Sequence, residues 1–159
     1  MSAADLIEKR TASLPTAKLV RRPSFDEVCT LAAERTAELL VEAVASRGSG
    51  HLALTGGSAG IALARSLPAT FAAAGISGSL LENVHLWFGD ERFVAAGDPD
   101  RNDLLVAGLV DAGLPDANVH RVRGPELVAG VDAAAAHLAE ELSATGPAEG
   151  RFDVVHLGV

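Results

Sequence analysis

The sequence predicts an α/β fold with a mostly parallel sheet, and three observations support this prediction. Short, nearly all-apolar runs have the pattern of strands covered on both faces, and they lie at residues 51–55, 83–88, 118–122 and 151–159. Helical stretches alternate with these runs, which is the order that parallel strands require. The 159 residues suffice for one domain with a substantial core. We therefore expect residues 1–159 to form a single α/β domain, incomplete at its C-terminus.

The composition argues against several classes of protein. No apolar run reaches the ~20 residues of a membrane-spanning helix, so no membrane partner is expected. The net charge is −8 and no Lys/Arg cluster is present, which argues against nucleic acid as a partner. The first ten residues contain acids and no apolar segment of the secretory type. The single cysteine excludes an intrachain disulfide, and together these features favour a cytoplasmic protein.

The first helix is expected between Pro23 and Gly48. Ser24 and Glu27 have the spacing of a capping box, which marks a helix N-terminus. Gly48 and Gly50 are expected to end the helix. Apolar residues at helical spacing predict its buried face: Phe25, Val28, Ala32, Leu39 and Ala43.

A glycine-rich turn joins the strand at residues 51–55 to a second helix. Gly56 and Gly57 allow positive φ and leave backbone N–H groups uncovered, and Ser58 adds a hydroxyl group. With the N-terminus of the following helix, these groups could bind a phosphate. A tight strand-to-helix turn without a ligand explains the pattern equally well. Pro68 is expected to break or restart the helix.

Three charges follow the strand that contains the only tryptophan of the chain. Residues 83–88 lead through Gly89 to Asp90, Glu91 and Arg92. Because ligands of parallel sheets bind at the carboxyl ends of the strands, we expect these charges to lie beside the Gly-Gly-Ser turn. The carboxylates suit acid–base chemistry or the orientation of Arg92, whose guanidinium suits a phosphate or a developing oxyanion. For such a triplet alone, a solvated turn is the favoured alternative.

The segment after these charges has turn chemistry. Asp100 is expected to cap a short helix that extends through Leu109. Arg101 and Asn102 are polar groups near the start of that helix and are further candidates to reach a ligand, although residues in such turns more often do not.

A third long helix is expected from Pro125, which suits a first turn. Its predicted buried face consists of Leu127, Val131, Ala135, Leu138 and Leu142. The five histidines lack the spacing of metal ligands, so no metal site is expected and they are interpreted as structural or surface residues. Cys29 is expected to pack in the core rather than to act as a nucleophile.

Three stretches resemble one family. LALTGGSAGIAL, VHLWFGDERFVAAGDPDRND and FDVVHLGV look like 6-phosphogluconolactonase, the sugar-phosphate lactone hydrolase of the pentose phosphate pathway. Related enzymes include glucosamine-6-phosphate deaminase and ribose-5-phosphate isomerase, so the resemblance implies a Rossmann-like three-layer fold. It extends from about Pro23 to the end. The deaminases usually have Asp-Glu-Tyr after the tryptophan-type strand, whereas this chain has Asp-Glu-Arg and contains no tyrosine.

The resemblance implies hydrolysis of 6-phospho-D-glucono-1,5-lactone without a cofactor, with Asp90, Glu91 and Arg92 as catalytic residues. The implied sugar-phosphate-binding residues are Gly56, Gly57, Ser58, Arg92, Arg101 and Asn102. The Gly-x-Asp-Gly-His segment of the family, whose histidine is thought to activate water, would follow HLGV and is not in this sequence. The 159 residues alone are therefore expected to lack turnover. The alternatives are an isomerase or deaminase of the same superfamily, or a sugar-phosphate-binding module without catalysis.

Overall fold

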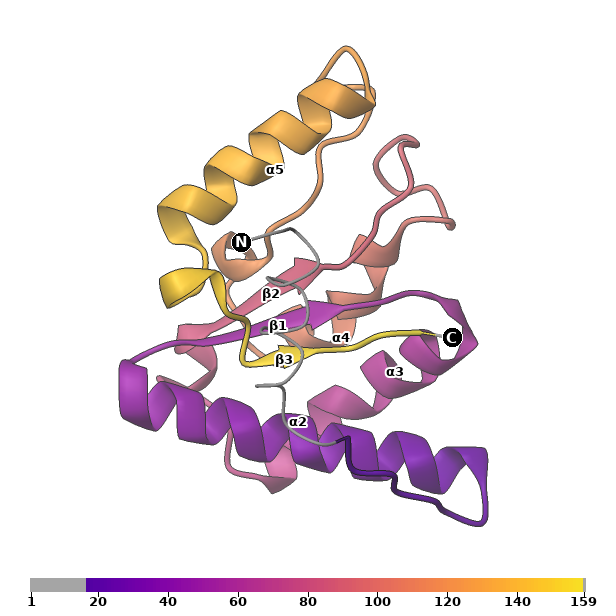
Figure 1. The fold of residues 1–159 in the computed structure, drawn as a ribbon, viewed down its shortest axis with the longest axis vertical. Coiled ribbons are helices and arrows are strands. Elements are labelled where there is room, and N and C mark those ends of the chain that lie inside the picture. Colours follow the sequence, from indigo (N-terminus) through magenta and orange to yellow (C-terminus); the bar gives the residue numbers. More distant parts are fainter. Residues whose placement is uncertain (1–16, 159) are drawn as a thin grey trace, which may run out of the picture.

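The computed structural model describes residues 17–158 and contains a three-stranded parallel sheet in the order β2-β1-β3. The strands are β1 (Gly50–Leu54), β2 (Val84–Phe88) and β3 (Val154–Val155). Helices α2 and α3 cover one face, and α5 lies over the other (Figure 1). The predicted α/β fold with a parallel sheet is confirmed. The first ten residues, for which the sequence predicts no signal peptide, lie outside the described residues.

Helix α2 (Phe25–Arg47) begins where the capping box predicts. The Ser24 hydroxyl accepts a hydrogen bond from Glu27 N–H at 3.2 Å, and Gly48 ends the helix with φ 84°. The predicted buried face is wrong at Phe25 and Val28, which are 52% and 45% exposed. Ala43 is buried as predicted, and Ala32 and Leu39 are half-buried. The buried residues are Cys29, Ala33, Thr36, Ala37, Leu40 and Ala43. Most of these side chains are small and let the helix approach the sheet and α3 closely, whereas the predicted face included the larger Phe25, Val28 and Leu39.

Helix α3 (Gly57–Ala73) passes through Pro68 without interruption, so the predicted break is wrong. Proline removes one backbone hydrogen bond and crowds the preceding turn. Leu67 and Phe71 lie on either side of Pro68 and are 0% and 1% exposed. Their burial against the core stabilises the helix across the proline, since a fully buried Leu or Phe contributes about 1.5–3 kcal/mol.

The segment after β2 differs from the prediction at its helix start. A 3₁₀ turn, η2 (Asn102–Val106), leads into the short helix α4 (Ala107–Asp111). Asp100 does not cap η2; its own N–H donates to the Asp98 carboxylate at 2.9 Å. The side chain that caps η2 is Glu91, which receives Asn102 N–H at 2.7 Å. The cap therefore comes from a distant loop rather than from the adjacent residue.

The C-terminal elements are shorter than expected. Residues 118–122 form no regular strand and contribute one isolated bridge, from Val119 to Leu86. Helix α5 (Val131–Thr145) begins after a turn at Pro125, and Ala134 is the one buried residue among those it contains. Leu127 and Val131, predicted to be buried, are 65% and 62% exposed. Of the last apolar run, Val154–Val155 pairs with β1.

The two faces of the sheet are packed differently. Leucine and phenylalanine side chains on one face form the core with α2 and α3: Leu52, Leu54, Leu86 and Phe88. The other face carries what we call the histidine–tryptophan layer, made of His51, His85, Trp87 and His120. The Trp87 and His120 rings stack with centroids 3.7 Å apart, and those of His51 and His85 with centroids 4.7 Å apart.

No helix within the described residues is long and apolar enough to cross a membrane.

Candidate functional site

A cleft of about 330 Å³ opens at the carboxyl ends of β1 and β2. The strands stay paired one residue beyond β2, because Gly89 N–H donates to the Leu54 carbonyl at 2.8 Å. The two chains then separate, and their loops form the walls of the cleft together with the start of η2. The lining residues are Thr55, Gly56, Gly57, Ile61, Asp90, Arg92, Pro99, Asp100, Arg101, Asn102 and Leu105.

The β1 wall is a turn that requires glycine. Gly57 has φ 74°, in the left-handed region, and is the first residue of α3. A Cβ at Gly56 would collide with the side-chain oxygen of Asn102. The first N–H groups of α3 have no acceptor within the helix, and the helix N-terminus carries partial positive charge. This wall can therefore offer backbone donors to an anion.

The β2 wall presents two exposed charges, Asp90 and Arg92. The sequence predicts that the neighbouring carboxylates orient the Arg92 guanidinium, and the structure does not show this. Within residues 17–158, no carboxylate lies within ion-pair distance of that guanidinium. Glu91 instead accepts the backbone N–H of Arg92 at 2.9 Å. The Arg92 side chain thus has no acidic partner in the described residues and is available for an anionic ligand.

Glu91 lies behind the cleft rather than on its surface. Its side chain is 1% exposed, and the residue is not among those that line the cleft. The carboxylate accepts backbone N–H groups from Arg92, Asn102 and Asp103, the last at 2.9 Å. All of these donors are protein groups, so the proposed catalytic role of Glu91 stays a prediction without a surface position to support it.

Arg101 contributes to the lining, but its guanidinium is engaged inside the protein. Its side chain is 3% exposed. The three nitrogens donate to the Asp103 carboxylate at 3.0 Å and to two backbone carbonyls, those of Val94 and Val122, at 3.2 and 2.6 Å. The guanidinium has no free nitrogen for a substrate phosphate in this arrangement.

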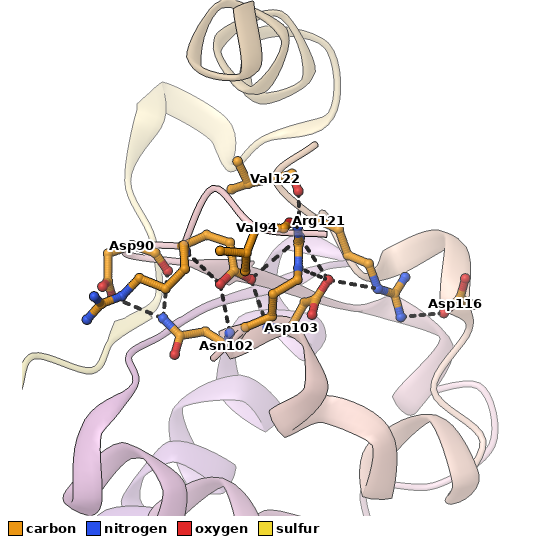
Figure 2. A network of polar contacts seen from close by, with 10 residues as sticks. Asp90, Val94, Asn102, Asp103, Asp116, Arg121 and Val122 are labelled. Atoms are coloured by element: carbon orange, nitrogen blue, oxygen red, sulfur yellow. Dashed lines mark hydrogen bonds and ion pairs between the residues drawn. The ribbon is translucent and has the colours of Figure 1, made fainter. Parts of the chain in front are cut away.

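Asn102 connects the two walls, and Figure 2 shows its side chain beside Asp90. Its side-chain amide donates to the Asp90 carbonyl at 2.9 Å and to the Asp90 carboxylate at 3.3 Å. Its side-chain oxygen is the atom that lies against Gly56. The amide therefore fixes the distance between the glycine turn and the acidic end of β2.

The structure brings six of the predicted residues to one cleft: Gly56, Gly57, Asp90, Arg92, Arg101 and Asn102. Ser58 lies in the exposed first turn of α3 beside the cleft, outside the lining, and Glu91 lies behind it. Their roles as site residues stay predictions.

Sequence reasoning missed several lining residues. Thr55 directly follows β1 and Pro99 belongs to the Asp-Pro-Asp turn, so the rule that ligands bind at strand ends could have found both. Ile61 and Leu105 carry no such signal, because apolar residues on helices are normally core residues. Within the described residues, no group of three or more His, Cys, Asp and Glu side chains is placed to hold a metal ion.

Comparisons with known proteins agree on one family. The model of the family described as "Glucosamine-6-phosphate isomerases/6-phosphogluconolactonase" matches residues 23–159. The 6-phosphogluconolactonase of Streptomyces coelicolor is 37% identical over 91% of this chain and 58% of its own length. That of Mycobacterium tuberculosis is 38% identical over 86% of this chain and 56% of its own length. The chain thus spans a little over half the length of these relatives.

A solved structure also matches the fold. The crystal structure of a protein named devB superposes with a TM-score of 0.59 at 24% identity, over 84% of this chain and 54% of that one. At this identity the likeness shows a common fold.

Proposed function

Because the chain belongs to the glucosamine-6-phosphate isomerase/6-phosphogluconolactonase family, we propose that its cleft binds a sugar phosphate for hydrolysis of 6-phospho-D-glucono-1,5-lactone to 6-phospho-D-gluconate. The observation that carries the proposal is the placement of the Gly56–Gly57 turn and the Arg92 guanidinium in one cleft. Backbone donors at a helix N-terminus and an arginine without an acidic partner in the described residues are both suited to a phosphate.

Lactone hydrolysis requires only a few catalytic groups. A water oxygen adds to the carbonyl carbon, the bond from that carbon to the ring oxygen breaks, and a proton passes to the released hydroxyl group. The reaction needs an anchored phosphate, a base for the water and a positive group or N–H near the tetrahedral oxyanion. It needs neither a metal nor a covalent nucleophile in principle.

The residues of the cleft divide these tasks. Arg92 binds the phosphate or the developing oxyanion, and the N–H groups at Gly56 and Gly57 supply further donors. Asp90, held by Asn102, orients sugar hydroxyl groups. The base that activates water is expected in a Gly-x-Asp-Gly-His segment that these residues do not include, so the 159-residue chain binds without turnover.

Ligand binding by the 159-residue chain tests the proposal. We expect 6-phospho-D-gluconate, the reaction product, to bind when titrated calorimetrically, and unphosphorylated gluconate to bind far more weakly. Arg92→Ala is expected to weaken the binding of 6-phosphogluconate by about tenfold or more, since a hydrogen bond to a charged group contributes ~1.5–3 kcal/mol. In an intact active protein, the same change would lower kcat/KM for the lactone.

Arg151→Ala is the matched control, because it removes the same charge from a side chain that is 83% exposed and outside the cleft lining. If wild type and Arg92→Ala bind 6-phosphogluconate equally tightly, Arg92 does not contact the phosphate. Clear lactone turnover by the chain would contradict the expected absence of the base.

The second candidate is an aminosugar-phosphate isomerase or deaminase, because the description of the matching family names glucosamine-6-phosphate isomerases beside 6-phosphogluconolactonase. Release of ammonia from glucosamine 6-phosphate by an intact protein, without lactone hydrolysis, would favour it. The relatives quoted above carry the lactonase name, which favours the hydrolase.

A further inference from the structure

A buried polar network lies directly behind the cleft and joins three separate segments (Figure 2). The first is the loop after β2 that contains Glu91, and the second is the start of η2. The third is the extended segment at Val122, whose carbonyl accepts from Arg101 at 2.6 Å. The network therefore connects the β2 wall of the cleft to parts of the chain about 10 and 30 residues further on.

Glu91 caps η2 from outside the helix. Its two carboxylate oxygens accept Asn102 N–H at 2.7 Å and Asp103 N–H at 2.9 Å, the first donors of the 3₁₀ turn. The oxygen that receives Asn102 N–H also receives Arg92 N–H at 2.9 Å. One buried carboxylate thus fixes the backbone at two lining residues, Arg92 and Asn102.

Arg101 offsets the buried negative charge. Its guanidinium lies 2.9 Å from the Asp103 carboxylate and 3.7 Å from Glu91. Its bonds to the carbonyls of Val94 and Val122 leave no nitrogen without an acceptor. Burial of a charged side chain is costly unless it is paired and hydrogen-bonded, and Glu91 and Arg101 meet that condition. Asp103 pairs with Arg101 through Oδ2, whereas its buried Oδ1 has no hydrogen-bond partner within the described residues.

We infer that Glu91 and Arg101 are positioning residues, which hold Asn102 against the glycine turn and fix the backbone at Arg92 without touching the ligand. The inference deepens the proposed function and rests on it for the identity of the ligand. It replaces a direct catalytic role for Glu91 and a direct phosphate contact for Arg101. The geometry gives the reason, since each guanidinium nitrogen of Arg101 and both carboxylate oxygens of Glu91 have partners inside the protein.

Glu91→Gln is the first test, in the 159-residue chain. The amide oxygen of Gln can still accept from Arg92 and Asn102, but its NH₂ group would face the Asp103 N–H, donor against donor. Amide hydrogen exchange followed by NMR is expected to be about tenfold faster at Asn102 and Asp103, with the central residues of β1 unchanged. The Kd for 6-phosphogluconate is expected to rise by about tenfold.

Arg101→Lys is the second test. It keeps the inference testable if Glu91→Gln does not fold. It keeps the positive charge but cannot make the three directed bonds of the guanidinium. A residue that contacts the phosphate through charge would retain most of the affinity in this variant. A positioning residue would lose it, together with exchange protection at Asn102.

Asp116→Asn is the matched control for both variants. It weakens a 2.7 Å contact to Arg121 at the outer end of the same network, where the Asp116 side chain is 70% exposed. Neither exchange at Asn102 nor the Kd is expected to change.

Each outcome decides one question. If wild type does not bind 6-phosphogluconate, the proposed function fails for this chain. Exchange then decides the inference: faster exchange at Asn102 and Asp103 in Glu91→Gln supports it, and unchanged exchange at both residues overturns it. If wild type binds and both variants bind as tightly, the inference is overturned whatever the exchange rates show.

Discussion

The two faces of the sheet stabilise the molecule by different means. The face toward α2 and α3 is a close-packed apolar core in which Leu52 and Leu86 are fully buried. The face toward α5 is the histidine–tryptophan layer, whose polar atoms need partners as well as packing. Trp87 Nε1–H donates to His51 Nδ1 at 3.2 Å, and His85 Nδ1 lies 3.0 Å from His120 Nε2.

The contrast teaches that an all-apolar strand pattern does not specify how each face is covered. Alternation places His51 and His85 opposite each other in register, on the face away from the apolar core. Helix α5 reaches this face through Glu141, whose carboxylate accepts from His120 Nδ1 at 2.7 Å. One face therefore depends on burial, and the other depends on a short chain of directed hydrogen bonds.

The largest expected effect is on the apolar face. Leu86→Ala should lower the free energy of unfolding by about 2–5 kcal/mol, because Leu86 is 0% exposed and a cavity would remain. Urea denaturation followed by circular dichroism measures the change. His85→Ala, at the next position and on the other face, is the comparison and should cost less. Equal losses would show that the two faces are packed to the same degree.

The second largest effect is expected from acid, which should lower the stability of the folded chain. Burial is the main cause that lowers the pKa of His51 to about 4, and the neighbouring His85 lowers it further. Burial also lowers the pKa of His85. On the other face, His156 lies beside Thr36 of α2, and burial lowers its pKa to about 4. These histidines have a pKa of about 6.5 when unfolded, so the unfolded chain binds more protons below that pH. Stability that is complete above pH 6.5 should be lost as the pH falls toward 4.

Thermal unfolding between pH 7.5 and 4.5 measures this dependence, and a fall in Tm of about 5 °C or more is expected. His51→Phe, which keeps an aromatic ring in the layer, should reduce the slope. An unchanged slope in this variant would show that His51 is not the source of the acid sensitivity, which would then rest with His85 and His156.

The smallest effect is expected at α5. Glu141→Ala leaves His120 Nδ1 without its acceptor and should cost about 1–2 kcal/mol, with faster amide exchange in α5. Glu140→Ala, an exposed neighbour on the same helix, should change stability by no more than about 0.5 kcal/mol. If both variants behave alike, Glu141 does not hold α5 on the sheet.

Sequence patterns predicted the features that depend on local chemistry. The capping box at Ser24, the strand at residues 51–55 and the glycine turn all follow from neighbouring residues. The sheet-edge rule also placed Asp90 and Arg92 beside Gly57, because parallel strands end at a common edge.

What could not be predicted depends on contacts between distant segments. Glu91 is buried because Asn102 and Asp103, which are distant in sequence, donate their backbone N–H groups to its carboxylate. The local sequence around Glu91 gives no sign of these donors. Likewise, the α2 face follows the space available beside α3 rather than the size of the apolar residues. Helix α5 begins only at Val131, after the turn at residues 125–130, and buries one residue, Ala134. Helical periodicity does not reveal that turn.

The contact between Gly56 and Asn102 has a consequence for engineering of the cleft. Since a methyl group at position 56 would occupy the space of the Asn102 amide, the effects of mutations at the two positions cannot be additive. Alanine at position 56 requires the Asn102 amide to move or to be replaced by a smaller side chain, and either change disturbs its link to Asp90. Libraries that vary position 56 alone would therefore disturb this link, whereas paired substitutions at positions 56 and 102 could reach new loop geometries.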